Sequence, residues 1–261
     1  MDDAARANWT LKEDIREYWS RRAETFDDSP GHRIDDRFEA PYWHALLDAA
    51  FGDLAGRRVL DVACGTGEIS RMLLARGAAV TGVDFAEPML DRARAKHRGK
   101  DWRGRLADAE TLAGEPDDSY DAVVTRHLVW TLLDPPAAFA AWHRVLKPGG
   151  RLLVVDGNWV RPTPVGRLLR ALANRLGAKR SGDGDPERHA AILAQVHYRD
   201  GLTAARLADD LGRAGFTGFR RHGMGGIYGP GLRGAPLTDR LRLRAASRFA
   251  VSACKRGTAA G

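Results

Sequence analysis

The sequence predicts an α/β fold in which a doubly wound, mostly parallel sheet carries helices on both faces. Short apolar runs alternate with helical patterns through the first 156 residues, as is typical of parallel strands joined by right-handed crossovers. The first run leads into a glycine turn, Gly65-Thr66-Gly67, and the second ends in Asp84. In such sheets ligands bind at the carboxyl ends of the strands, so these two features predict a binding crevice.

Two amphipathic helices are expected before the alternation begins. Their periodicity covers residues 9–23 and 38–51, and the turn-rich residues 27–31 separate them. Strands are then expected at 58–62, 79–83, 102–107, 120–125 and 151–156. The helices between them are expected at 67–76, 87–97 and 136–146.

The pattern becomes less regular after residue 156. A helix is expected at 164–177, followed by a Gly/Asp/Pro linker over 181–186. A second helix follows the linker and ends at about Tyr198, and a third is expected at 202–214. A sixth strand should start at 216–219, and a seventh should cover 248–254.

Composition fits a globular protein without a membrane segment. The chain is 44% hydrophobic and 29% charged, and no apolar run approaches the roughly 18 residues needed to cross a bilayer. The N-terminus lacks a signal-peptide pattern, so we expect a cytoplasmic location. Two cysteines, Cys64 and Cys254, form neither a disulfide framework nor a zinc spacing, and no metal site is expected.

Charge is distributed unevenly along the chain. Residues 157–261 contain 19 Lys and Arg against 7 Asp and Glu, although the whole chain has a net charge of only +7. This basic half could attract an acidic substrate or nucleic acid. The alternative is a set of solvated helix faces, because Arg167, Arg170 and Arg175 alternate with leucines as an amphipathic helix requires.

The glycine turn and Asp84 together indicate a pocket for a cofactor that carries a nucleoside. Glycine lets the backbone approach a ligand closely, and a carboxylate at the next strand end can accept hydrogen bonds from ribose hydroxyls. The dinucleotide pattern G-x-G-x-x-G is incomplete, because Ser70 occupies the place of its third glycine. Glu68 would also repel a diphosphate at the start of the following helix.

Five segments, in order, resemble the motifs of class I S-adenosylmethionine (SAM)-dependent methyltransferases, in particular the branch that acts on small molecules. The segments are 61–67 (DVACGTG), 84–90 (DFAEPML), 108–110 (DAE), 120–127 (YDAVVTRH) and 146–152 (LKPGGRL). The resemblance covers residues 55–156 and, more weakly, 200–255. It implies a Rossmann-like sheet of seven strands whose last strand lies antiparallel beside the fifth.

The resemblance also implies a division of the chain. Residues 1–50 would form an N-terminal helical lid, 51–157 the SAM-binding core, 158–200 a helical cap insertion and 201–261 the remainder of the core sheet.

Roles for individual residues follow from the same resemblance. Ala63, Gly65 and Gly67 would pack against the methionine part of SAM, Asp61 would line the same side of the cofactor crevice, and Asp84 would bind the ribose. Phe85 and Met89 would flank the adenine, while Asp108 and the Ala109 N–H would contact its edge. Arg126 or His127 would meet the methionine end, and Tyr18 belongs to the lid segment that covers the cofactor. Asp84 as a helix cap, Asp108 as a turn residue and Met89 as core filler are the alternatives.

Two histidines are candidates for acid–base catalysis, His127 after the fourth strand and His197 in the cap. A general base is needed only if the acceptor arrives protonated. The alternatives are that His127 only hydrogen-bonds the cofactor or the backbone and that His197 ends a surface helix. Aromatic residues of the lid and cap, among them Trp19, Trp130 and Trp159, could wall an apolar acceptor pocket or simply join the helices to the core.

The sequence therefore predicts transfer of a methyl group from SAM to an O, N or S atom of a small molecule, a secondary metabolite or a thiol, with release of S-adenosylhomocysteine (SAH). Two alternatives stay open: an RNA methyltransferase that uses the basic half of the chain, and a SAM-binding module without turnover. No RNA-binding module is visible, so nucleic acid is the less favoured partner.

Overall fold

Seven strands form a single sheet in the computed structural model, which describes residues 10–177 and 186–257. The spatial order is β3-β2-β1-β4-β5-β7-β6. The strands are β1 (Arg58–Val62), β2 (Ala79–Asp84), β3 (Trp102–Leu106), β4 (Tyr120–Arg126), β5 (Leu146–Asn158), β6 (Phe216–His222) and β7 (Ser247–Lys255). Strands β1 to β5 pair in parallel, whereas β7 runs antiparallel to both β5 and β6. The predicted fold class and the antiparallel seventh strand are confirmed.

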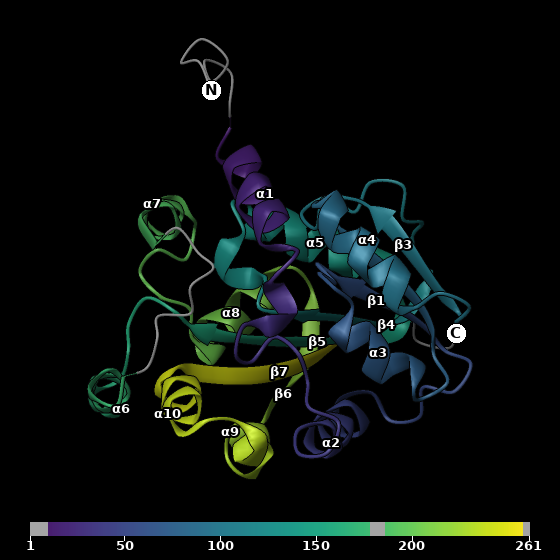
Figure 1. Ribbon diagram of the computed structural model, residues 1–261. Helices are drawn as coiled ribbons and strands as arrows, with labels where there is room; N and C mark the ends of the chain where they lie inside the picture. The colour runs from purple at the N-terminus through teal and green to yellow at the C-terminus, as the bar shows by residue number, and fades with distance from the viewer. Residues whose placement is uncertain (1–9, 178–185, 258–261) are drawn as a thin grey trace.

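Helices cover both faces of the sheet and gather at its left-hand end in Figure 1. The longer ones are α1 (Leu11–Arg22), α2 (Ala40–Phe51), α3 (Glu68–Leu74), α4 (Glu87–Lys96), α5 (Pro135–Val145), α6 (Pro164–Arg175), α7 (Pro186–Gln195), α8 (Ala204–Arg213) and α10 (Leu237–Ala245). Short helical turns are η2 (Phe26–Asp28), η3 (Val129–Thr131), α9 (Gly225–Tyr228) and η4 (Pro230–Gly234). None of the helices in the described ranges is long and apolar enough to cross a membrane.

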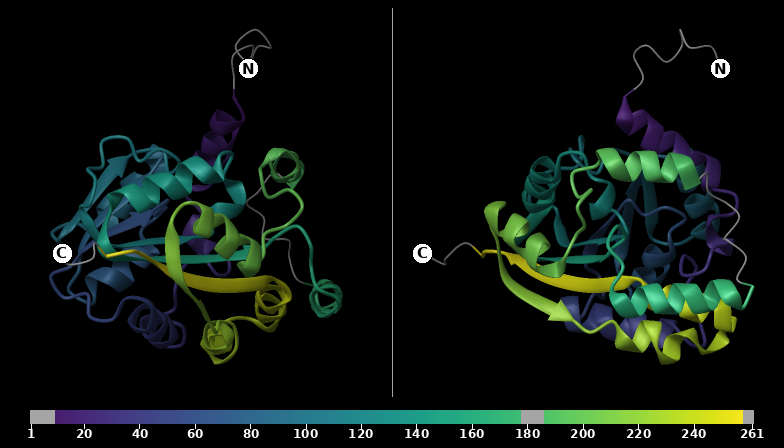
Figure 2. Two further views of the ribbon diagram at one scale, coloured as in Figure 1. Left: turned by 180° about the vertical axis from the view of Figure 1, so that it is seen from behind. Right: turned by 90° about the vertical axis from the view of Figure 1, so that its left-hand side faces the viewer.

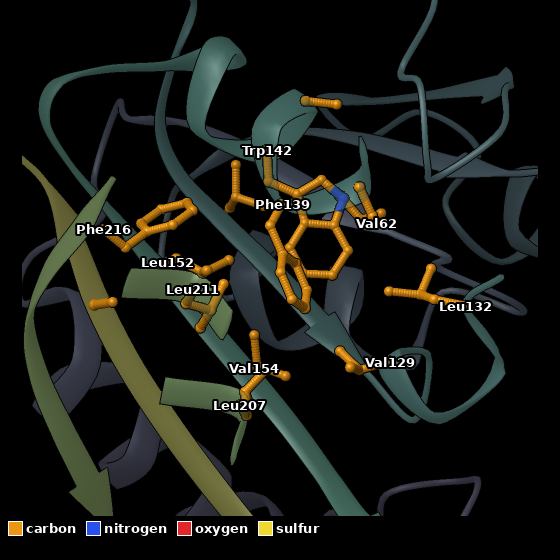
Figure 3. Close-up of a cluster of buried hydrophobic side chains, with 14 of the residues drawn as sticks. Val62, Val129, Leu132, Phe139, Trp142, Leu152, Val154, Leu207, Leu211 and Phe216 are labelled. Atoms are coloured by element: carbon orange, nitrogen blue, oxygen red, sulfur yellow. The ribbon is translucent and has the colours of Figure 1, made fainter. Parts of the chain in front are cut away.

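Two apolar clusters hold these layers together. On one face α5 and α8 pack on the sheet, and Figure 3 shows Phe139 and Trp142 of α5 beside Leu207 and Leu211 of α8. On the other face α2, α3 and α9 pack through residues such as Trp43 and Met72. Burial of such large side chains contributes roughly 1.5–3 kcal/mol each. This core fixes the strand ends that carry the site.

The helices at the end of the sheet form two pairs. Helix α1 packs against α7, and α6 packs against α10 (Figures 1 and 2). By contrast α2, which the resemblance groups with the lid, lies in the core cluster through Trp43, Leu46 and Leu47. We therefore propose that the lid consists of α1 and the segment after it, while the other predicted boundaries stay predictions.

Sequence and structure differ most in two places. Strand β5 starts at Leu146 rather than at residue 151, because Leu146 is already extended and pairs with Tyr120. The segment between β6 and β7 contains α9, η4 and α10, which the sequence analysis did not predict; it is rich in glycine and arginine, so its apolar periodicity is weak. Trp9 and residues 181–185 of the predicted linker lie outside the described residues.

Candidate active site

The site lies where the strand order reverses. Strand β1 pairs with β2 on one side and with β4 on the other. From β1 the sheet continues through β2 and β3 in one direction and through β4 and β5 in the opposite direction. The carboxyl ends of β1, β2 and β4 carry the glycine turn, Asp84 and the segment after Arg126. This is the crevice position that the topology of open α/β sheets predicts.

The turn after β1 adopts backbone conformations that allow close approach to a ligand. Ala63 and Gly65 have φ values of 55° and 53°, in the left-handed region. The Cys64 N–H donates to Val83 O at 2.9 Å, and the Gly65 N–H donates to Asp84 Oδ2 at 2.9 Å. The turn is thus held to the end of β2, and the polar groups of both strands face one crevice.

Gly67 serves the packing of the turn. It has a φ of 82°, and a Cβ there would lie 2.5 Å from His97 Nε2. The His97 ring also hydrogen-bonds the Gly67 carbonyl at 2.9 Å. Gly67 lines neither of the cavities that form the crevice. Steric fit against His97 explains this glycine without a contact to the cofactor.

Two buried carboxyl groups give the crevice its electrostatic character. Burial raises the pKa of Asp84 to about 6, although the N–H groups of Ala86 and Gly65 oppose the shift by donating to it. Burial likewise raises the pKa of Asp61 to about 7, against a 2.7 Å hydrogen bond from Ser70 Oγ. A bound cation or sugar hydroxyls would stabilise the ionised form of either group.

Two adjoining cavities, together called the crevice, bring most of the predicted cofactor residues together. Their open volumes are about 750 and 410 Å³, counted up to the bulk solvent. Predicted residues that line them are Asp61, Ala63, Gly65, Asp84, Phe85, Met89, Asp108, Ala109, Arg126 and His127. Residues that the sequence analysis did not single out include Lys12, Phe26, His32 and Thr131.

Lys12 of α1 closes one end of the crevice. Its Nζ lies 2.7 Å from Asp108 Oδ2 and 2.5 Å from Glu110 Oε2. Burial lowers the pKa of Lys12, but the hydrogen bonds to both carboxylates outweigh burial and raise it. Glu110 also accepts N–H bonds from Leu133 and Asp134. The predicted adenine ligand Asp108 is therefore part of a contact between the lid and the core.

Glu68 anchors the segment after α1 to the start of α3. It pairs with Lys96 at 2.6 Å and accepts the Ile34 N–H at 3.0 Å. These hydrogen bonds outweigh burial and lower the pKa of Glu68 to about 2. Since a carboxylate and its partners occupy this helix N-terminus, the structure supports the argument against a diphosphate there.

Tyr18 and His197 lie outside the crevice. Tyr18 is buried between α1 and α7, where its hydroxyl is 3.3 Å from His189 Nδ1 and 2.9 Å from Arg22 Nη1. His197 is exposed next to Tyr198 and lines none of the described cavities. The structure therefore gives no support to an acid–base role for His197. His189 of α7 is the histidine of the predicted cap insertion that lines a cavity next to the crevice.

His127 lies at the reactive end of the crevice in a strained backbone conformation. Its φ is 61°, which is uncommon outside glycine, and its N–H donates to Val155 O at 2.8 Å. Its Nε2 is buried and has no hydrogen-bond partner among the described residues. Burial lowers the pKa of His127 well below its usual range, and Arg126 and Arg248 add to the shift. The imidazole is therefore neutral.

His32 lines the same two cavities as His127 and was not identified by the sequence analysis. Its ring stacks on Phe26 with centroids 4.0 Å apart, and its carbonyl accepts a 2.6 Å bond from Arg126. Burial lowers the pKa of His32 to about 3, and Arg126 contributes. No spacing in the sequence marks His32, because it reaches the site from an irregular segment.

A third cavity continues from the crevice at Trp19, His32 and His127, which line both. It has an open volume of about 1660 Å³. Because Arg22, Arg170 and Arg248 line it, we call it the arginine cavity. Within the described ranges, no group of three or more His, Cys, Asp or Glu side chains is arranged to hold a metal ion.

These residues fit SAM. The left-handed turn lets the backbone approach a ligand, Asp84 keeps lone pairs free for ribose hydroxyls, and the carboxylates suit a cationic sulfonium. When bound, SAM supplies a methyl carbon activated by the positive sulfur. Ala63, Gly65 and Asp84 would hold it, with Phe85 and Met89 as apolar walls.

Comparisons with known proteins agree with this reading. Residues 60–154 match a family model described as a methyltransferase domain. A ubiquinone biosynthesis O-methyltransferase of Xanthomonas euvesicatoria is 32% identical over 193 residues, which cover 73% of this chain and 74% of that protein. A demethylmenaquinone methyltransferase of Clavibacter sepedonicus is 37% identical over 126 residues, or 48% of this chain and 51% of the relative.

A solved structure shares the fold over nearly its whole length. The geranyl diphosphate C-methyltransferase of Streptomyces coelicolor, in complex with SAH, superposes with a TM-score of 0.63 at 16% identity and covers 95% of this chain and 99% of its own. Taken with the sequence relatives and the crevice, this likeness leads to one conclusion: the chain belongs to the class I SAM-dependent methyltransferases and is an enzyme whose cofactor is SAM.

Proposed function

We propose that the enzyme methylates an oxygen atom of a small aromatic molecule held where the crevice meets the arginine cavity. The observation that carries this proposal is the position of His127. His127 lines both the crevice and the arginine cavity, and its buried Nε2 has no hydrogen-bond partner among the described residues. A relative named as an O-methyltransferase supports oxygen as the acceptor atom.

The chemistry requires alignment and one proton acceptor. The acceptor oxygen displaces the thioether sulfur in line, so an O–C bond forms as the S–C bond breaks, and the sulfur keeps the electron pair. Holding both reactants in one cavity contributes most of the acceleration. His127 accepts the hydroxyl proton through Nε2.

The charge balance favours this role for His127. Burial lowers its pKa most, and Arg126 and Arg248 lower it further, so an isolated imidazolium would be unfavourable. During transfer, however, the positive charge of the sulfonium disappears as the positive charge of the imidazolium appears. The number of positive charges in the site is unchanged, which allows the imidazole to take the proton in the transition state.

Several neighbours fix the imidazole. The His127 carbonyl accepts the Trp130 indole N–H at 3.0 Å, and Trp159 contacts the ring edge-on at 5.1 Å. Asp156 in turn accepts the Trp159 indole N–H at 2.8 Å. These contacts hold the imidazole in one orientation between the two cavities.

The test uses His127→Asn, because asparagine tolerates a positive φ and so preserves the backbone. We expect kcat for phenol and catechol acceptors, followed by release of SAH, to fall by roughly 10²–10⁴-fold. The Kd of SAM should change less than threefold. A large loss of SAM affinity with little change in kcat would instead assign His127 to cofactor binding. A parallel assay with RNA tests the nucleic-acid alternative, for which we expect no methylation.

We also propose that the enzyme is located in the cytoplasm and acts in secondary metabolism, as the sequence leads us to expect. Fractionation of the producing cell and the identity of the methylated product would test these two proposals.

A further inference from the structure

The arginine cavity, which is partly open to solvent, has an unusual charge. Four arginines, Arg22, Arg170, Arg242 and Arg248, line it together with His32, His127 and His189, whereas no Asp or Glu of the described ranges lines it. Of the four, Arg22 and Arg248 have a buried Nε without a partner among the described residues. Uncompensated cations are costly to bury. The cavity therefore favours a ligand that brings negative charge.

Arg22 reaches the cavity from α1 with part of its hydrogen-bonding capacity unused. Its Nη1 donates to the Tyr18 hydroxyl at 2.9 Å, while its Nε is buried without a partner among the described residues. The guanidinium lies 5.5 and 5.4 Å from the ring centroids of Tyr18 and Trp19. Aromatic contact holds the group in place, but no carboxylate of the described ranges pairs with it.

Arg248 reaches the same cavity from β7. Its Nη1 donates to the Leu243 carbonyl, and its buried Nε has no partner among the described residues. The guanidinium lies 4.3 Å from the Tyr228 ring centroid and 5.2 Å from that of Trp159. Burial lowers the pKa of Arg248, although the charge of Glu39 opposes the shift, and no ion pair joins Arg248 to a carboxylate of the described ranges.

The other walls include aromatic rings next to aliphatic residues such as Leu193 and Leu243. Trp19, Trp130 and Trp159 line the cavity, and Trp19 contacts Trp130 edge-on with centroids 6.4 Å apart. Large rings of this kind bind planar apolar bodies. Guanidinium groups present paired N–H donors that match carboxylate and phosphate oxygens. Both halves of a ligand, a ring and an oxyanion, thus have partners in one space.

We propose that the acceptor of this enzyme carries an oxyanion, a carboxylate or a phosphate, on an aromatic body, and that Arg22 and Arg248 bind the oxyanion. Arg170, exposed on α6, lies at the mouth of the cavity and attracts the anion. This inference rests on the proposed function, because His127 is the point at which the cavity meets the crevice. It narrows the acceptor from a small molecule of any charge to an aromatic acid or aromatic phosphate.

The test compares ligands that differ only in charge. Binding of 4-hydroxybenzoate and of 4-hydroxybenzamide is measured by calorimetry and by quenching of tryptophan fluorescence, at low ionic strength with saturating SAH. We expect the acid to bind at least tenfold more tightly than the amide. Equal affinities within twofold would overturn the proposal. Phenyl phosphate and benzoate form a second pair, and tighter binding of either one, lost in the variants below, supports the proposal and identifies the oxyanion.

Matched variants locate the effect. Arg22→Gln and Arg170→Gln should each reduce the preference for the acid at least threefold, with the larger loss at Arg22. Arg21 and Arg167 belong to the same two helices, α1 and α6, but do not line the cavity. Arg21→Gln and Arg167→Gln should therefore leave the preference for the acid unchanged. Equal effects of the cavity variants and their controls would overturn the proposal. Arg248→Gln is added with a thermal melt to confirm folding.

The design separates two kinds of failure. The Kd of SAH is measured first in every variant, and absence of SAH binding by the unmodified protein would count against the proposed function. The acid–amide comparison is then repeated without SAH, where it still decides whether the cavity selects for negative charge. Methylation of neutral phenols with no discrimination against the amide would keep the proposed function and overturn this inference.

Discussion

The crevice and the arginine cavity share a border at His127, yet they are built from different parts and carry opposite charge. Four carboxylates line the crevice, Asp61, Asp84, Asp108 and Glu110, against the cations Lys12 and Arg126. The arginine cavity has cations and aromatic rings and no carboxylate of the described ranges. The crevice suits a cationic cofactor, and the cavity suits an anionic acceptor.

The two regions also differ in the elements that form them. The crevice comes from consecutive residues at the ends of β1, β2 and β4, whose positions the sheet fixes. The arginine cavity comes mainly from α1, the segment before α2, α6, α7, α10 and β7. A site for an invariant cofactor is thus formed by main chain and strand ends, whereas a site for a particular acceptor is formed by side chains of surrounding helices.

The largest effect that would separate the regions is expected at Asp84. Asp84→Asn places an amide opposite the N–H groups of Gly65 and Ala86 and removes the charged acceptor for ribose. Hydrogen bonds to charged groups contribute about 1.5–3 kcal/mol, so we expect the Kd of SAH to rise roughly 10–100-fold in calorimetry. Acid binding in the arginine cavity should be unchanged. Asp101→Asn, at an exposed position, is the control; equal losses in both variants would contradict the assignment.

A second variant tests whether Gly67 belongs to the packing rather than to the cofactor contacts. Gly67→Ala forces a Cβ against His97 at a φ of 82° and should destabilise the fold by about 1–3 kcal/mol. Gly99→Ala is the matched control, because Gly99 has a φ of 77° with nothing within 4 Å of a Cβ. The difference between their Tm values isolates the steric part. A normal Tm with abolished SAH binding would return Gly67 to the cofactor site.

The pH dependence of cofactor binding offers a third comparison. Burial raises the pKa of Asp84 to about 6, and the carboxylate is the form that accepts ribose hydroxyls. Protonation below that pH therefore weakens binding, and the affinity for SAH should rise about tenfold from pH 5 to pH 7, as the ionised fraction grows from about 0.1 to about 0.9. Asp84→Asn should flatten this profile. A fall in affinity over the same range would contradict the role of Asp84.

The smallest effect is expected at the lid. Lys12→Met removes both ion pairs to Asp108 and Glu110. Because Lys12 is 37% exposed, each pair contributes at most about 1 kcal/mol, and SAH should dissociate about two- to fivefold faster in stopped-flow measurements. Lys100→Met, an exposed lysine outside the site, should have no effect. An unchanged dissociation rate in Lys12→Met would show that α1 does not gate the crevice.

Strand ends are the part of the site that the sequence could predict. The strand 58–62 was placed with its observed bounds, and Ala63, Gly65 and Asp84 follow because a strand dictates where its last residue points. Gly67 shows the limit of this reasoning. Its φ could be expected from the turn, but its neighbour His97 lies thirty residues along the chain, and only the packing of α4 brings them together.

The arginine cavity could not be predicted in the same way. Arg22 and Arg170 look like solvated positions of amphipathic helices, and Arg248 lies within an otherwise apolar strand. Their convergence depends on how α1 packs on α7 and α6 on α10, which periodicity does not specify. The aromatic residues divide between the two alternatives given for them: Trp19, Trp130 and Trp159 line the cavity, whereas Trp43 of α2 joins its helix to the core.

The place of β7 in the sheet bears on how the chain assembles during synthesis. It separates β5 from β6, so residues 216–222 have no partner strand until residues 247–255 have left the ribosome. The strands β1, β2 and β4 need none of those residues, and local contacts form before distant ones. A nascent chain can therefore shape its cofactor-binding half first, and the strand that contributes Arg248 is the last to join the sheet.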